Sequence, residues 1–366
     1  MRLRDRDYGM SASDSQSAPD RGHVASLDLL RAAASLAVCW FRFVGREDNF
    51  LPDGVLKSTG QYFWLGVEAF FVVSGFVIPW ALGRGNYRLH DYGRFLLKRI
   101  VRLDPPYLLS IGIVLVLAFA ATLSPLYRGK PFLIDWTQLA LHLGYLNVFF
   151  PDKPWLNSVY STLAIEFEYY LLVGLLYPLL VHRSAAVRRI TLAFFVLTCI
   201  PITSDKHLPH YAPLFALGII AFQLRTNLIG QNEATISTVL IAFLGVTASN
   251  PLFMTVGLTS MAVILWVRNC PRIVEFFGRI SYSMYLLHIP IGSRVINLSM
   301  KWSQTFATKL LVIFAAFAAT TIAAYVFYRL IELPSTRWSK RFRYRRARQI
   351  TETADPPARS TTPDPS

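Results

Sequence analysis

Residues 27–42 read LDLLRAAASLAVCWFR, an apolar stretch that carries two arginines, Arg31 and Arg42, eleven positions apart. Eleven residues make about three helical turns, so both side chains point from one helix face, roughly 16 Å apart along the axis. A guanidinium group inside a membrane is costly, and it is found there where it lines a cavity or pairs with another polar group. The stretch therefore predicts a membrane helix with a functional face.

The composition is typical of a polytopic membrane protein. Of the 366 residues, 53% are hydrophobic and 16% are charged, against about 45–50% and about 25% in an ordinary soluble domain. The net charge of +15 is concentrated beside predicted membrane boundaries, which indicates cytoplasmic loops and lipid headgroups rather than a nucleic-acid partner. The cysteines Cys39, Cys199 and Cys270 form no CxxC pair, so we expect neither a disulfide framework nor a metal site.

We expect an all-α bundle of about ten transmembrane helices, because each span needs about 20 mostly apolar residues. Segment 234–267 is broken by Ser249-Asn250-Pro251, so it is interpreted as a hairpin of two spans. Segment 132–150 contains Asp135 and His142 and is interpreted as a re-entrant or interfacial helix in an outer loop. The other predicted spans are 26–44, 61–82, 105–123, 157–181, 190–203, 211–224, 280–298 and 309–328.

The basic residues agree with ten spans. Clusters of Arg and Lys precede the first span, fill the connections at 84–102, 183–189 and 268–279, and follow the last span. With both termini cytoplasmic, all these clusters lie on the cytoplasmic side, as the positive-inside rule requires. The chain then divides into a cytoplasmic N-terminal tail (1–25), a transmembrane domain (26–334) and a basic, then disordered, cytoplasmic tail (335–366).

The first helix and the connection after the second span supply basic candidates. Asp28 and Arg31 are three residues apart, close enough for an ion pair that serves either a cavity or the headgroup layer. Arg42 either shares the functional face or extends to the outer interface. Arg99 and Arg102 lie one turn apart before two prolines that we expect to open the third span. They are either membrane anchors or an anion site suited to phosphate groups.

Three further patterns place polar groups within spans. The Ser74-Gly75 pair permits close helix contact. Glu166 and Tyr170 are stacked four residues apart, and the carboxylate is either functional or neutralises a buried arginine. Residues Ser281, Tyr285 and His288 form one polar stripe, which favours a polar cavity over three separate structural contacts.

Taken together, these motifs resemble the acyltransferase 3 family of integral membrane acyltransferases. The resemblance covers residues 27 to about 334. The motifs are the LDLLR opening, FFVVSGF at 70–76, the RIVRLDPPY run at 99–107, the glutamate and tyrosines at 163–170, and GRISYSMYLLH at 278–288. Membership implies a bundle of about ten helices. It also implies transfer of an acetyl or other acyl group from cytoplasmic acyl-CoA to a hydroxyl of a sugar, a glycan, peptidoglycan or a macrolide.

The resemblance also assigns residues. Arg31 matches the arginine of the family's first-helix Arg-x10-His motif, and Glu166 and His288 match recurrent polar positions, which makes all three catalytic candidates. Arg99 and Arg102 match basic residues proposed to meet the CoA phosphates. The remaining candidates for binding acyl-CoA, with acetyl-CoA as the expected donor, are Lys98, Tyr107, Ser74 and Tyr285.

One departure concerns the base. The family's first-helix histidine falls where this chain has Arg42, and arginine cannot accept a proton at neutral pH. Three possibilities stay open: Glu166 or His288 is the base, Arg42 stabilises the oxyanion of the acyl-transfer intermediate, or transfer is lost in this chain.

The leading hypothesis is therefore a bacterial inner-membrane O-acyltransferase that needs no metal. A catalytically silent relative that only binds its ligands is one alternative. A transporter or flippase is the other, for which inverted repeats between the two halves of the chain would be expected.

Overall fold

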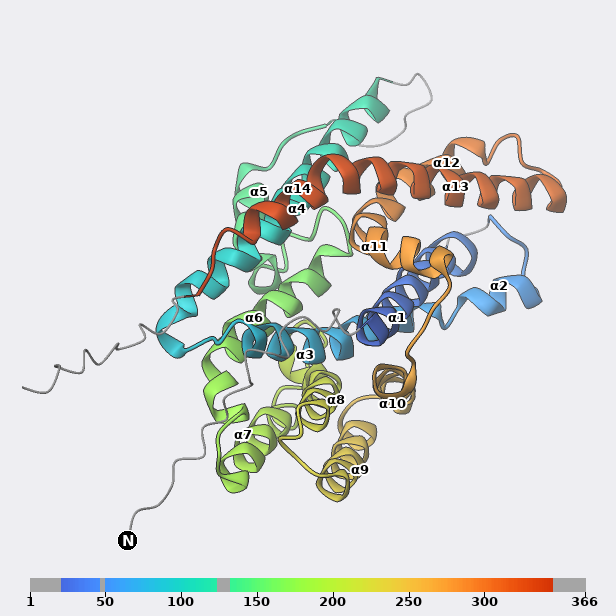
Figure 1. The fold of residues 1–366 in the computed structure, drawn as a ribbon. Coiled ribbons are helices and arrows are strands. Elements are labelled where there is room, and N and C mark those ends of the chain that lie inside the picture. Colours follow the sequence, from blue (N-terminus) through green and yellow to red (C-terminus); the bar gives the residue numbers. More distant parts are fainter. Residues whose placement is uncertain (1–20, 47–49, 124–131, 345–366) are drawn as a thin grey trace, which may run out of the picture.

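The computed structural model describes residues 21–46, 50–123 and 132–344, and these form helices and connections without a β-strand. The all-α bundle predicted from the sequence is confirmed (Figure 1). Its α-helices are α1 (Arg21–Trp40), α2 (Val55–Gly60), α3 (Gly66–Arg84), α4 (Tyr92–Thr122), α5 (Trp136–Leu143), α6 (Tyr160–Leu180), α7 (Ala185–Leu197), α8 (Leu208–Arg225), α9 (Gln231–Ala248), α10 (Pro251–Trp266), α11 (Arg272–Leu287), α12 (Arg294–Ser299), α13 (Phe306–Phe327) and α14 (Leu333–Ser339).

Shorter turns extend several of these helices. Three are π-helical, namely η2 (Phe41–Arg46), η6 (His288–Ser293) and η7 (Tyr328–Glu332), and three are 3-10 turns, namely η3 (Phe63–Leu65), η4 (Leu89–Asp91) and η5 (Leu146–Phe149). Single π turns inside helices occur frequently at functional sites. In this chain η2 contains Arg42, η6 begins with His288 and η7 ends with Glu332.

Four helical runs of the described chain are individually long and apolar enough to cross a membrane: Val55–Arg84, Leu89–Thr122, Tyr160–Leu180 and Phe306–Ser339. The predicted break at residues 249–251 is also observed. The Asn250 side chain accepts the Leu252 N–H at 2.9 Å and caps α10, whose first residue is Pro251. Proline is favoured there because the first helical N–H has no partner in any case.

The third predicted span begins earlier than expected. The prolines Pro105 and Pro106 lie inside α4, which starts at Tyr92 and runs for 31 residues. Helix α4 packs against α6 and α14, and the Arg99 guanidinium lies over the Tyr170 ring of α6. Packing of a helical face against neighbours outweighs the local cost of the prolines, so Arg99, Arg102 and the apolar span belong to one helix.

Two glycines bring α3 and α8 together at the centre of the bundle. A Cβ atom on Gly75 would lie 2.2 Å from the Phe215 carbonyl oxygen, and one on Gly218 would lie 2.2 Å from that of Val72. Small residues permit such close approach of membrane helices. The contact fixes the orientation of α3, which also packs against α1, α6 and α10.

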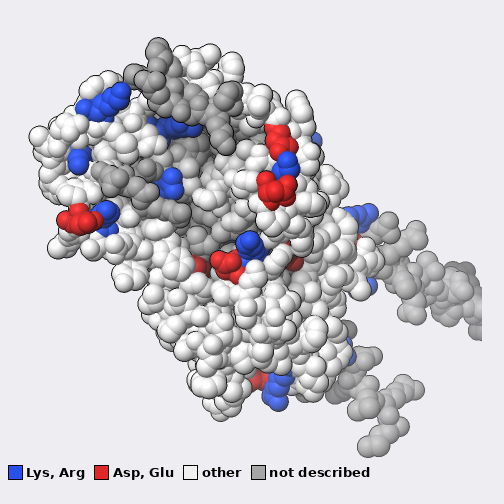
Figure 2. Space-filling view, turned by 180° about the vertical axis from the view of Figure 1, so that it is seen from behind, with Lys and Arg blue, Asp and Glu red and all other residues white. Residues whose placement is uncertain are grey.

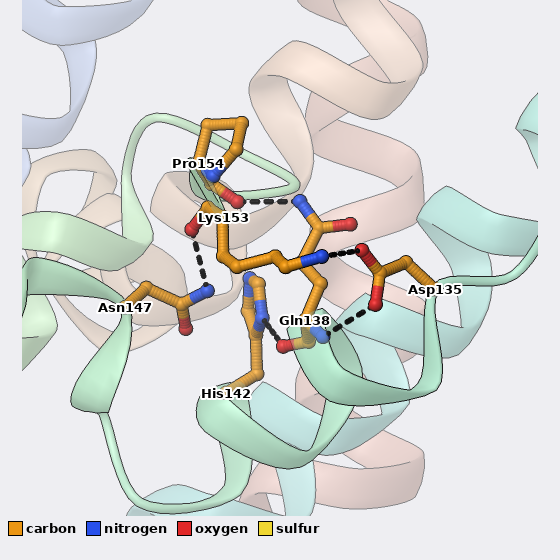
Figure 3. Close-up of polar contacts among 6 residues, drawn as sticks. All are labelled: Asp135, Gln138, His142, Asn147, Lys153 and Pro154. Atoms are coloured by element: carbon orange, nitrogen blue, oxygen red, sulfur yellow. Dashed lines mark hydrogen bonds and ion pairs between the residues drawn. The ribbon is translucent and has the colours of Figure 1, made fainter. Parts of the chain in front are cut away.

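The segment between α4 and α6 contains only short helices. Helix α5 has eight residues, about 12 Å at the helical rise, too short to cross a membrane. Polar contacts hold it to the chain that follows (Figure 3): Lys153 Nζ lies 2.6 Å from Asp135 Oδ2, and Gln138 Nε2 donates to the Pro154 carbonyl at 2.5 Å. The bond from Lys153 lowers the pKa of Asp135.

His142 is one of the buried residues of the 132–159 segment, named the outer segment after the outer loop predicted for it. Its Nδ1 lies 2.7 Å from the Gln138 carbonyl oxygen, and its Nε2 lies 3.1 Å from the Leu156 backbone nitrogen. A carbonyl only accepts and a backbone N–H only donates, so these partners select the neutral ring with its proton on Nδ1. Burial lowers the pKa of His142 and so also favours the neutral ring.

Candidate active site

A cavity of about 270 Å³ lies where α1, α3, α4, α6, α11 and the η7–α14 segment meet. Six of the ten residues proposed from the sequence line it, namely Arg31, Ser74, Arg99, Arg102, Glu166 and Tyr285. They come from five helices that are far apart along the chain. The cavity wall combines these polar groups with apolar side chains of α3, such as Val73 and Val77.

Glu166 is held from two sides. The Ser74 hydroxyl donates to its Oε1 at 2.8 Å, and the Tyr170 hydroxyl, one turn along α6, donates to the same oxygen. Ser74 and Gly75 are adjacent on α3. Gly75 packs closely against α8, and the Ser74 side chain contacts Glu166 of α6. With both hydroxyls on Oε1, the second oxygen, Oε2, is the one that can accept a proton or a hydrogen bond from a substrate.

Three arginines converge on the same cavity. Arg31 comes from α1, and Arg99 and Arg102 come from consecutive turns of α4. The Arg99 side chain is only 6% exposed. Its guanidinium carbon lies 5.5 Å from the ring centroids of both Phe95 and Tyr170. Its Nε has no hydrogen-bond partner among the described residues.

Carboxylates balance part of this positive charge. Asp28, Glu166 and Glu332 act electrostatically on Arg31, and Arg102 opposes them. Glu332 ends the π turn η7 and accepts a hydrogen bond from the Ser283 hydroxyl at 2.5 Å. The cavity therefore combines fixed positive and negative charges, which suits a polar and partly anionic ligand more than an apolar one.

The polar stripe on α11 is divided between two places. Ser281 and Tyr285 line the cavity, and the Tyr285 hydroxyl lies 2.5 Å from that of Thr162 on α6. His288 is buried, and its Nδ1 lies 2.7 Å from the Tyr285 carbonyl oxygen, but it is not part of the cavity wall. The ring of Tyr285 lies 5.9 Å, centroid to centroid, from that of His288.

Arg42 lies beside His288 rather than beside Arg31. Its Nε donates to the Ser293 hydroxyl at 3.2 Å, which joins the π turns η2 and η6. Its charge acts on the His288 ring. The two arginines of the first helix thus serve different surroundings: Arg31 lines the cavity, and Arg42 and His288 form a second polar cluster.

Two more predicted residues lie outside the cavity wall. Lys98 places its Nζ 5.4 Å from the ring centroid of Tyr344, near the end of the described chain. Tyr107 is 1% exposed, stacks on Tyr145 at 4.9 Å and donates to the His142 carbonyl at 3.1 Å. Tyr107 therefore connects α4 to the outer segment.

The cavity also contains residues outside the ten site candidates, among them Asp28, Thr162, Tyr170, Tyr282 and Glu332. Some had a visible signal, because Tyr170 is stacked on Glu166 at a four-residue spacing and Asp28 lies three residues before Arg31. Tyr282, whose hydroxyl donates to the Leu103 carbonyl at 3.0 Å, could not be distinguished from the neighbouring serines. Within the described ranges no group of three His, Cys, Asp or Glu side chains is arranged to hold a metal ion.

Comparison with known proteins agrees with these observations. The sequence matches the acyltransferase-domain family, acyltransferase 3, over residues 24–329. It is 25% identical over 365 residues to the O-acetyltransferase OatA of Staphylococcus aureus strain NCTC 8325 / PS 47, covering 85% of this chain and 57% of that protein. The same values hold for OatA of strains COL and MRSA252.

The chain thus spans 57% of the length of these curated relatives. No solved structure matches it. The family match extends over most of the chain and over the helices that carry Arg31, Arg99, Arg102 and Glu166, and the chain belongs to the acyltransferase 3 family.

Proposed function

We propose that this protein is a membrane O-acyltransferase that moves an acyl group, most simply acetyl, from acyl-CoA to a hydroxyl of a sugar, glycan or macrolide-like acceptor. The family supports the acyl-transfer reaction. The name of the OatA relatives supports O-acetylation. The observation that carries the proposal is the cavity that Glu166 and three arginines line together.

The donor would occupy the arginine side of the cavity. Guanidinium groups pair with phosphates in a two-pronged geometry, and Arg99 and Arg102 lie one turn apart on α4. Lys98 on the same helix adds a positive charge outside the cavity. Tyr107 is excluded from the proposed donor site by its burial. By the positive-inside rule this surface faces the cytoplasm of a bacterial cell, with both termini inside and the protein in the inner membrane.

Glu166 is the proposed base. Its Oε2 would accept the proton of the acceptor hydroxyl while that oxygen attacks the thioester carbonyl. A tetrahedral oxyanion would form and be stabilised by the fixed charge of Arg31. Collapse would break the carbon–sulfur bond, CoA would leave as a thiolate that takes up a proton, and the acyl ester would remain on the acceptor. No metal takes part in this scheme.

The position of Arg42 favours Glu166 as the base over His288, and it argues against Arg42 as the group that stabilises the oxyanion. Arg42 and His288 lie together outside the cavity wall, so neither is placed to meet a thioester bound beside Arg99. Loss of the first-helix histidine then does not remove the base. The competing candidate is a silent relative that binds acyl-CoA without turnover. The substitution at position 42 favours this candidate if the family's first-helix histidine is the base.

The test is transfer of radiolabelled acetyl from acetyl-CoA by the full chain in lipid vesicles, with a panel of glycan and macrolide acceptors. We expect Glu166→Gln to lower turnover by about 10²–10⁴-fold, the range typical of a lost general base, while acetyl-CoA binding persists. Arg99→Gln should instead weaken binding. The matched control is Asp53→Asn, which removes a surface carboxylate paired with Lys57. Binding without turnover in the unmodified protein would support the silent relative. The absence of both binding and turnover would refute the proposal.

A further inference from the structure

A second hollow lies on the opposite part of the bundle, between α7 and α9, where Gln223 of α8 and Ile229 of the following connection also line it. These three helices pack together at the lower edge of the view in Figure 1. The groove has a volume of about 640 Å³. Its walls are apolar side chains of α7 and α9, such as Leu192, Val196, Leu240 and Leu244. None of its lining residues belongs to the cavity that contains Glu166.

One end of the groove is polar and basic. Arg188, Arg189 and Glu233 line it there. The Arg189 Nε lies 2.8 Å from Glu233 Oε1, so this carboxylate is already neutralised and the second arginine leaves a net positive charge. The exposed Arg183 adds to that charge at the same end of α7. This end suits an anionic group.

Arg188 contributes an unused donor. Its side chain is 8% exposed, and its terminal nitrogens donate to the carbonyls of His182, Arg183 and Leu228. Its Nε, in contrast, has no acceptor among the described residues. This nitrogen is also shielded from solvent, so Arg188 contributes a fixed positive charge at this end of the groove, and the exposed Arg189 is the side chain that a ligand can contact.

The dimensions and surroundings indicate a lipid. From Glu233 to Leu244 the groove follows eleven residues of α9, about 16 Å at the helical rise, which is close to half of the ~30 Å hydrocarbon thickness. The flanking faces of α7 and α9 expose large apolar side chains, including Phe194 at 66% and Phe243 at 69%. Figure 2 shows that charged side chains occur in small groups separated by broad uncharged areas.

We infer that this groove binds one anionic glycerophospholipid, with an acyl chain between α7 and α9 and its phosphate at the Arg188–Arg189 end. An uncharged headgroup would leave the net positive charge at this end unmatched. A basic pocket between membrane helices is the arrangement that recognises such headgroups. The site is separate from the proposed acyl-transfer cavity. Lipid binding to it is measured without an activity assay, so the test does not depend on whether the protein transfers acyl groups.

The test is native mass spectrometry of the purified full chain with dioleoyl phosphatidylglycerol or dioleoyl phosphatidylcholine, which differ in headgroup alone. We expect one phosphatidylglycerol per chain, bound about tenfold more tightly than phosphatidylcholine. Leu240→Trp fills the groove and should reduce this binding at least tenfold. Val239→Trp is the matched control, because Val239 is 61% exposed and Leu240 62%, but only Leu240 lines the groove.

The headgroup contact has its own pair of variants. Arg189→Gln should weaken phosphatidylglycerol binding about fivefold, the effect of one lost surface charge, and leave phosphatidylcholine unchanged. Arg268→Gln, an exposed arginine elsewhere, should change neither. Equal binding of the two lipids, or equal effects of Leu240→Trp and Val239→Trp, would overturn the inference and assign the groove to non-selective membrane lipid.

Discussion

Glu166 lines the cavity, and one of its two carboxylate oxygens is committed to the protein. Ser74 and Tyr170 both donate to Oε1, and Arg31 lies within electrostatic range. Such contacts hold the carboxylate in one orientation, which is what proton transfer in a confined site requires. At this scale we expect Arg42, in place of the family's histidine, to have a limited effect on transfer, because Arg42 bonds Ser293 outside the cavity wall.

The Arg42→His variant tests that consequence. We expect its acetyl transfer to stay within about tenfold of the unmodified protein, because a change of about 1.4 kcal/mol is the most that a group remote from the reacting atoms should contribute. The measurement is turnover of radiolabelled acetyl-CoA across pH 6 to 8. A gain above a hundredfold would mean that the first-helix histidine is the base and that the present chain is silent.

At the scale of elements, close packing of α3 on α8 positions the Ser74 side of the site. Gly75→Ala should lower the free energy of unfolding by about 1–3 kcal/mol, the usual cost of overpacking, because its Cβ would lie 2.2 Å from the Phe215 carbonyl oxygen. The control is Gly112→Ala in α4, where nothing lies within 4 Å of the new Cβ, and a gain of about 0.5–1 kcal/mol is expected. Thermal unfolding in detergent compares the two, and equal melting temperatures would contradict this view of the helix contact.

The outer segment should lose stability in acid. His142 has a pKa lowered by burial, so between that value and the usual pKa near 6.5 the unfolded segment binds more protons than the folded one. Its stability is then complete above about pH 6.5 and is lost as the pH falls. Asp135 does not contribute between pH 7.5 and pH 5, because Lys153 holds its pKa below the usual 3.8 and its own loss of stability begins only at lower pH.

Hydrogen exchange of the amides in residues 136–156, compared at pH 7.5 and pH 5 after correction for intrinsic rates, measures the effect. We expect less protection at pH 5, and a smaller pH difference in His142→Gln, whose side chain does not titrate. The same pH difference in both proteins would assign the change to another group.

At the scale of the whole molecule, the bundle separates two hollows with different chemistry. The cavity between α1, α3, α4, α6 and α11 contains both arginines and carboxylates, whereas the groove between α7 and α9 is apolar with a basic end. In the proposed topology the two hollows share one side of the membrane, because the positive-inside rule places the arginines of both at the cytoplasmic surface.

Sidedness is tested by labelling introduced cysteines with a membrane-impermeant maleimide in intact cells, in a Cys270→Ser background whose remaining Cys39 and Cys199 are buried. We expect Asp152→Cys, in the outer segment, to be labelled, and Ser184→Cys, before α7, to be labelled only after the cells are opened. Both positions are exposed, so reactivity differs by side alone. The reverse pattern would invert the predicted topology.

Local sequence determined the helical class, most helix positions, the break before Pro251 and the polar candidates, because apolar periodicity and charge inside a span act over a few residues. It also indicated six of the residues that share the cavity. Only the tertiary structure separated Arg42 and His288 from Arg31, placed Tyr107 in the packing, extended α4 back to Tyr92 and added Glu332. These outcomes depend on how distant helices pack, through contacts such as Gly75 with Phe215, and spacing along one helix carries no information about the distance to another.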